Sequence, residues 1–247
     1  DLAMSPAYDG LDETWAQPLV GMPVDRAVVS GAINDEQGKF NLNNLVQSNQ
    51  RSATDVTIFQ SLLASLGLSR DLADAVVDWI DKDSDVSGNG GAEDAYYLSL
   101  AKPYRTANRP MVQVEELYRI RGFDAATVAK LRPYVTAIPI PLPPASAPTV
   151  NVNTASDLVL MAYMPGVAPD KIENLIAIRR TKPFKSKDAL TTWDPKATSF
   201  AGTRIDVTSS YYSTSVVVAQ DDVQLATDAL LVRGQGKVGV VWQRPRF

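Results

Sequence analysis

The end of the chain carries the feature that most constrains the fold. Three runs rich in β-branched and aromatic residues follow one another, RIDVTSSYYSTSVVVAQ (204–220), ATDALLVRGQG (226–236) and KVGVVWQRP (237–245). Short polar or glycine-rich segments, DD at 221–222 and GQG at 234–236, separate them. Such breaks between strand-like runs are typical of tight turns. The residues therefore predict an antiparallel three-stranded meander.

A second strand-like region lies near the start of the chain. Val28, Val29 and Ile33 precede the polar segment DEQG (35–38), and Phe40 follows it. This pattern predicts a hairpin that turns at residues 35–38. If the hairpin and the terminal meander share one sheet, the chain between them is an insertion into a small β domain.

The middle of the chain has helical periodicity, with apolar residues three and four apart from about residue 44 to 193. Three segments each predict two helices joined by a glycine-containing turn: LASLGLSRDLADAVVDWID, LYRIRGFDAATVAKLRPYV and LMAYMPGVAPDKIENLIAIRR. The proline-rich run IPIPLPPASAP (138–148) favours an extended connector. We therefore predict an α+β protein. Its discontinuous β-containing domain comprises residues 1–43 and 206–247, and its inserted all-helical domain (44–205) has two lobes, 44–137 and 149–205.

Composition excludes several kinds of chemistry. The sequence has no cysteine and no histidine. Disulfides, thiolate metal sites and catalytic triads that need either residue are therefore excluded. A formal net charge of −4 supplies no overall positive field for nucleic acid or anionic membranes.

One segment keeps a nucleic-acid alternative open. Residues 151–190 resemble the helix-hairpin-helix modules of DNA-binding and competence proteins, which bind phosphate through backbone N–H groups of a glycine turn. Here the turn reads GVAP (166–169), where alanine restricts the backbone and proline removes a donor. Residues 165–190 still hold six basic and three acidic side chains, the basic ones being Lys171, Arg179, Arg180, Lys182, Lys185 and Lys187. We expect no nucleic-acid partner.

The stretch DWIDKDSDVSGNGGAEDAYY (78–97) concentrates six carboxylates around a single lysine. Asp81, Asp83 and Asp85 alternate along the chain, and Glu93 and Asp94 follow a glycine-rich excursion. Alternate spacing lets a turning loop direct several hard oxygens at one point, and such a ligand set suits calcium better than octahedral magnesium. We predict that Asp81, Asp83, Asp85, Glu93 and Asp94 bind Ca²⁺, with Asp78 a weaker candidate.

This loop is not an EF-hand, because Val86 stands where that motif needs glycine and Glu93 comes one residue late. Two other interpretations remain open. The acids could form a hydrated turn, or a pair of them could serve a glycosidase-like hydrolase. The hydrolase would need an aromatic cleft, and we expect Trp79 to lie in the core instead because it falls on the apolar stripe of its helix.

Several segments in the right order resemble one family over nearly the whole chain. They are DETWAQPL, GAINDEQGKFNLNNL, DWIDKDSDVSGNGGAEDAYY, RPMVQVEELYRIRGF, NVNTAS and the closing strands. Together they resemble the K-type minor pseudopilins of the type II secretion systems of Gram-negative bacteria. The resemblance implies a pilin-like α/β domain interrupted by a large helical domain with helix-hairpin-helix-like (SAM-like) units.

The resemblance also implies a structural function without catalysis. Such proteins assemble with I-type and J-type minor pseudopilins at the tip of the periplasmic pseudopilus, and the H-type minor pseudopilin is a further candidate partner. A hydrophobic helix, cleaved and methylated by a prepilin peptidase, is expected just before Asp1 and would anchor the protein in the inner membrane. One or two calcium ions are implied at the acidic loop. A helix-hairpin-helix DNA-binding protein remains the alternative.

Overall fold

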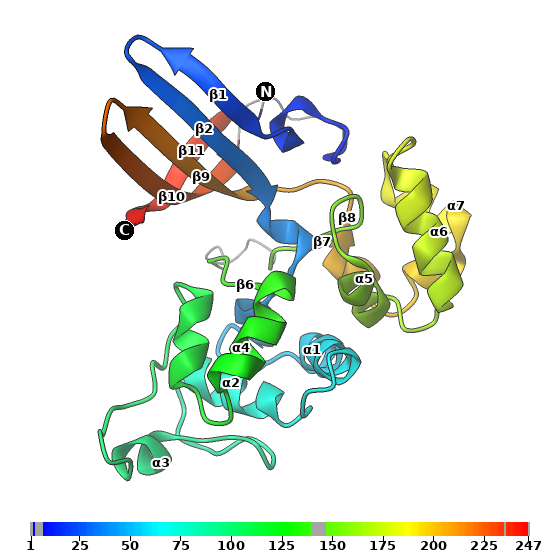
Figure 1. Cartoon of the computed structure of the whole chain (residues 1–247). Coiled ribbons are helices and arrows are strands. Elements are labelled where there is room, and N and C mark those ends of the chain that lie inside the picture. Colours follow the sequence, from blue (N-terminus) through cyan, green and yellow to red (C-terminus); the bar gives the residue numbers. More distant parts are fainter. Residues whose placement is uncertain (1, 3–6, 140–146, 235, 247) are drawn as a thin grey trace.

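The computed structural model describes residues 2, 7–139, 147–234 and 236–246. Strands from the two ends of the chain form one five-stranded antiparallel sheet (Figure 1). Its order is β1 (Leu19–Val24), β2 (Ala27–Asp35), β9 (Tyr211–Gln220), β10 (Val223–Gly234) and β11 (Lys237–Arg246). The predicted C-terminal meander is therefore confirmed, and the N-terminal strands join it through the pairing of β2 with β9.

The N-terminal hairpin turns at a different place from the one predicted. β1 and β2 reverse at Asp25 and Arg26, where Asp25 has a φ of 51°. Residues 35–38 are instead the exit from the sheet, a 3-10 turn η2 (Glu36–Gly38) followed by β3 (Phe40–Asn41). The sequence pattern hid β1 because this edge strand is fully exposed and irregular, with a register shift between Leu19 and Met22.

All α-helices of the described residues lie between β2 and β9. They are α1 (Ala53–Ser65), α2 (Leu72–Ile80), α3 (Asp94–Leu98), α4 (Ala125–Leu131), α5 (Asp157–Tyr163), α6 (Pro169–Arg179) and α7 (Lys187–Trp193). Short polar side chains begin four of them, since Ser52, Asp124, Ser156 and Ser186 each accept a hydrogen bond from the backbone N–H three residues later. In the second predicted helix pair, the first member is a 3-10 helix, η4 (Val114–Arg119).

Short two-stranded pairs join the helices to one another. β3 runs parallel to β6 (Val135–Thr136), and β7 (Val150–Asn151) runs parallel to β8 (Ile205–Asp206). β4 (Val46–Gln47) and β5 (Gln50–Arg51) are antiparallel. Further 3-10 turns are η1 (Thr14–Ala16), η3 (Leu42–Leu45), η5 (Arg132–Tyr134), η6 (Pro195–Ala197) and η7 (Gly202–Arg204).

One hydrophobic core runs through both predicted helical lobes. Phe40 stacks on Phe59 of α1 with ring centroids 5.1 Å apart, and Tyr163 of α5 lies 6.2 Å from Phe40. Helices α1 and α5 therefore pack side by side although they come from different lobes (Figure 1). Stacked and tilted aromatic rings at these distances add to the stability gained from burial.

Asparagines hold the two described ends of the proline-rich connector, whose residues 140–146 lie outside the described part of the chain. Asn41 Oδ1 accepts from the backbone N–H of Ile138 (2.9 Å), and Asn44 Nδ2 donates to the carbonyl of Pro148 (2.8 Å). Both asparagines are buried, so these bonds replace water for groups that would otherwise be unpaired. The asparagines of the motif NLNN (41–44) therefore fix both described ends of the connector to the core.

No helix of the described ranges combines the length and apolar composition needed to cross a bilayer.

Candidate functional site

Three acidic side chains meet where α2 ends and α3 begins. Asp81 follows the last residue of α2, and its extended backbone (ψ 173°) turns the chain away from the helix axis. Glu93 directly precedes α3. One carboxylate oxygen from each of Asp81, Asp83 and Glu93 lies within 4.8 Å of the others. We call these three residues the acidic cluster.

Two members of the acidic cluster are buried without hydrogen-bond donors. Asp81 is 5% and Glu93 4% exposed, while Asp83 faces solvent. Asp81 Oδ1 and Glu93 Oε1 accept no hydrogen bond from any described residue. Buried polar atoms are nearly always paired, so two orphaned oxygens at one point indicate a missing positive partner.

The electrostatics of the acidic cluster agree with this geometry. Burial, and then the charges of Asp83 and Asp78, raise the pKa of Asp81 to about 7. Burial also raises the pKa of Glu93 to about 7, with the neighbouring aspartates adding to the effect. Both groups are therefore costly to ionise until a cation compensates them.

The other predicted ligands lie outside the acidic cluster. Asp94 is occupied elsewhere, since Oδ1 accepts from the backbone and hydroxyl of Thr106 (3.0 Å each) and Oδ2 pairs with Arg105. Asp85 is exposed, and its backbone N–H donates to Asp83 Oδ1 (3.0 Å). The weaker candidate Asp78 accepts from the backbone N–H of Ser87 (3.1 Å).

Glycines allow the loop between α2 and α3 to pack closely against α2, on the face that carries Asp74 and Asp78. A Cβ at Gly90 would lie 1.9 Å from the carbonyl oxygen of Asp71, and one at Gly91 would lie 2.3 Å from Oδ2 of Asp78 in α2. Larger residues would force the loop away from the helix. The run SGNGG (87–91) is the sequence signal of this close packing.

The acidic cluster fits a hard divalent cation. Calcium binds oxygen at 2.3–2.6 Å, so ligand oxygens on opposite sides of one ion lie about 5 Å apart. The 4.8 Å limit within the cluster is compatible with that separation. Three carboxylates and two orphaned oxygens supply the charge and the free lone pairs that such an ion requires.

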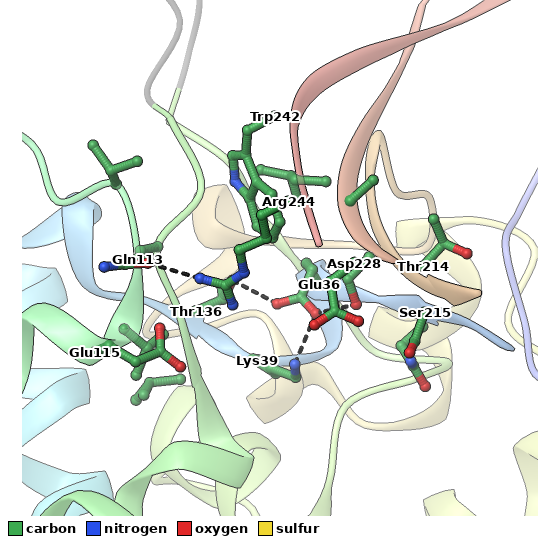
Figure 2. Close-up of a pocket in the computed structure, with 18 of the residues that line it drawn as sticks. Glu36, Lys39, Gln113, Glu115, Thr136, Thr214, Ser215, Asp228, Trp242 and Arg244 are labelled. Atoms are coloured by element: carbon green, nitrogen blue, oxygen red, sulfur yellow. Dashed lines mark hydrogen bonds and ion pairs between the residues drawn. The ribbon is translucent and has the colours of Figure 1, made fainter. Parts of the chain in front are cut away.

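A cleft of about 260 Å³, lined by both polar and apolar residues, lies between the sheet and the helical part of the chain (Figure 2). Its buried acid Glu36 accepts from Lys39 (2.8 Å), Thr136 (2.6 Å) and Ser213 (2.7 Å). Arg244 from β11 reaches across to Gln113 (2.7 Å). These hydrogen bonds connect the sheet to the helical part of the chain. The cleft is therefore lined by groups with a structural role.

The hydrolase interpretation loses its aromatic cleft. Trp79 is buried, as predicted, and its ring packs edge-on against Tyr97 with centroids 5.5 Å apart. Its indole N–H donates to Glu116 (3.3 Å). Tyr97 is also fully buried. Trp79 and Tyr97 therefore stabilise the core beneath the acidic loop, whereas Tyr96 is 38% exposed.

Two basic residues of the helix-hairpin-helix segment make contacts within the protein. Arg179, the first of the adjacent arginines, is buried and donates to the carbonyl of Val152. Lys187 lies 3.6 Å from Asp206. Pro169 is the first residue of α6, so the helix start lacks one of the N–H groups that a phosphate would use.

Comparisons with known proteins agree with the family resemblance. Two family models described as "Type II secretion system (T2SS), protein K" match residues 38–140 and 150–210. Type II secretion system protein K of Aeromonas hydrophila is 31% identical over 264 residues, which cover 99% of this chain and 78% of that protein. The Pseudomonas aeruginosa protein of the same name is 38% identical over 188 residues, which cover 74% of this chain and 54% of that protein.

A solved structure shares the fold. A chain of the crystal structure of the GspK-GspI-GspJ complex from enterotoxigenic Escherichia coli matches with a TM-score of 0.81 and 22% identity. The match covers 100% of this chain and 90% of that one. The two family models together account for most of the sequence, and the Aeromonas relative extends the similarity to almost all of it. The chain therefore belongs to the type II secretion system protein K family.

Proposed function

We propose that this chain is the periplasmic part of a minor pseudopilin that assembles with I-type and J-type pseudopilins at the tip of the type II secretion pseudopilus. The observation that carries the proposal is the likeness, over the whole chain, to a chain of the GspK-GspI-GspJ complex, together with the family membership. A scaffolding role agrees with a cleft whose polar groups are used in structural bonds.

The sheet has an exposed apolar face that suits a pilin-like arrangement. Cross-strand neighbours Val29, Val218 and Leu225 lie on one face, and Leu225 is 65% exposed. A mostly apolar groove on this face is lined by Trp15 and Ile33 among others. We propose that the hydrophobic N-terminal helix implied by the family resemblance covers this face and anchors the protein in the inner membrane.

The shape of the molecule supports a place at the tip. The helices extend beyond one end of the sheet (Figure 1). In a filament of stacked subunits, a further subunit would have to occupy the space that this helical part fills. Steric exclusion therefore favours a terminal position.

The first experiment tests assembly. The chain should sediment as a monomer or a weakly associating species on its own, and as a discrete hetero-complex when mixed with the soluble domains of the I-type and J-type pseudopilins from the same genome. A parallel titration with duplex DNA at physiological salt should give no binding. The proposal would be contradicted if the chain formed no complex with either pseudopilin, or if it bound duplex DNA with a salt-dependent affinity.

We further propose that the acidic cluster binds Ca²⁺. Asp81, Asp83 and Glu93 would hold the ion, and the ion would supply charge compensation that orders the loop between α2 and α3. Asp85 is close to the cluster in sequence, and we propose it as a candidate additional ligand. Asp94 could bind the ion only after breaking its hydrogen bonds to Arg105 and Thr106. The described residues contain one such group of acids, so we propose one ion at this point.

The calcium proposal predicts a measurable heat of binding and a gain in stability. Calorimetric titration of chelator-stripped protein should record binding, and calcium at 100 times the dissociation constant should add about 2.7 kcal/mol to the free energy of unfolding. Asp83→Ala and Glu93→Ala should weaken binding strongly because each removes a ligand. Asp222→Ala, in the exposed turn between β9 and β10, is the control and should bind like the wild type. If titration gives no heat of binding and calcium does not raise the melting temperature, the acidic cluster does not bind calcium.

The raised pKa values predict how the metal-free protein responds to pH. Asp81 and Glu93 have pKa values of about 7 in the folded state, above their ordinary values of 3.8 and 4.5. Because the folded state binds protons more tightly, the stability of the metal-free protein should fall as the pH rises from about 4 to 7. Calcium needs the deprotonated carboxylates, so the stabilisation by calcium should grow over the same window.

Melting temperatures measured across this pH range, in chelator and in calcium, test the prediction. Asp81→Asn should flatten the profile in chelator because it removes one of the carboxyl groups that titrate in this window. If the wild-type and Asp81→Asn profiles run parallel, the cluster does not control this pH dependence.

A further inference from the structure

The loop between α2 and α3 contains Asn89 followed by Gly90. It is the one asparagine in the sequence that precedes a glycine. Asn89 is exposed and lies in a turn closed by a hydrogen bond from the N–H of Gly91 to the carbonyl of Ser87 (3.0 Å). A glycine has no Cβ to shield its amide nitrogen from the preceding side chain.

The amide nitrogen of Gly90 is chemically available. Within the part of the chain that the structure describes, its N–H donates no backbone hydrogen bond. Asparagine is a thermolabile residue, and exposed loop tips are where such changes concentrate. An amide nitrogen that donates no backbone hydrogen bond, next to an exposed asparagine side chain, is the nucleophile that the reaction needs.

We propose that Asn89 is a site of spontaneous deamidation and that occupation of the acidic cluster by calcium slows the reaction; the second part rests on the calcium site proposed above. The nitrogen of Gly90 attacks Cγ of Asn89 and forms a C–N bond. The side-chain amide leaves as ammonia with the proton from Gly90, which produces a succinimide. Water then opens the ring at either carbonyl and leaves aspartate or isoaspartate.

The reaction requires the loop to open. A Cβ at Gly90 would lie 1.9 Å from the carbonyl oxygen of Asp71, so the backbone of this residue is closely packed on the chain that leads into α2. Closing a five-membered ring between residues 89 and 90 changes the backbone there and displaces Gly90 from that contact. Deamidation therefore proceeds from the locally open population, which an ion that bridges Asp81 and Glu93 would reduce.

The products alter the loop in two ways. Both add a carboxylate to a segment that already carries six. Isoaspartate also lengthens the main chain by one methylene directly before Gly90, where the structure has no spare room. We therefore expect the isoaspartyl form to bind calcium more weakly than the unmodified protein.

Peptide mapping by mass spectrometry tests the proposal on the full chain, incubated at mildly alkaline pH with calcium or with chelator. In chelator, residue 89 should convert severalfold faster than Asn49, which is also exposed but precedes glutamine. In calcium, the rate at residue 89 should fall severalfold. Asn89→Gln should remove the signal, and Glu93→Ala should make the wild-type difference between calcium and chelator disappear.

The outcomes separate the two parts of the proposal. Conversion of residue 89 no faster than that of Asn49 would overturn the deamidation site. Equal rates in calcium and chelator, in a protein whose calorimetry records calcium binding, would overturn the coupling. Equal rates together with no heat of binding would contradict the proposed calcium site and leave the deamidation site supported.

Discussion

The rest of the structure depends on a buried polar turn where β2 leaves the sheet. Asp35, Glu36 and Gln37 are all buried, and each bonds to segments more than 90 residues away. Their partners are Asn151, Thr154 and Ser209 for Asp35, Thr136 and Ser213 for Glu36, and Thr149, Ser210 and Tyr211 for Gln37. This network holds the sheet against the helical part, because separating the two parts would leave buried polar groups without partners.

Much of the fold could be predicted from residue patterns. The terminal strands have β-branched runs with turn residues between them, and the helices have apolar spacing and polar caps, which are local signals. The sequence predicts a turn at residues 35–38 because Asp35 and Glu36 have the composition of an exposed turn, and this prediction is wrong. Their burial depends on hydroxyl and amide donors, such as Thr136 and Ser209, that no local pattern connects to them.

The concentration of like charge identifies the acidic loop in the sequence, but it does not predict which carboxylates come together. Alternate spacing suggested Asp81, Asp83 and Asp85 as equal partners, whereas the structure gathers Asp81 and Asp83 with Glu93. The difference arises because α2 ends at Ile80 and the glycine loop then returns along the helix to the start of α3. The pairing of Asp94 with Arg105 likewise depends on a tertiary contact.

Hydrogen exchange of the Gln37→Ala variant tests most directly whether the buried turn joins the two parts of the molecule. Gln37 donates to Thr149 (2.9 Å) and accepts from the N–H groups of Ser210 (2.6 Å) and Tyr211 (3.2 Å). Its removal should lower the free energy of unfolding by about 2–3 kcal/mol. It should also speed exchange on both sides of the junction, at the start of β9 and around β7, while the exposed control Gln224→Ala changes neither. Faster exchange confined to one side, or none at all, would contradict the account.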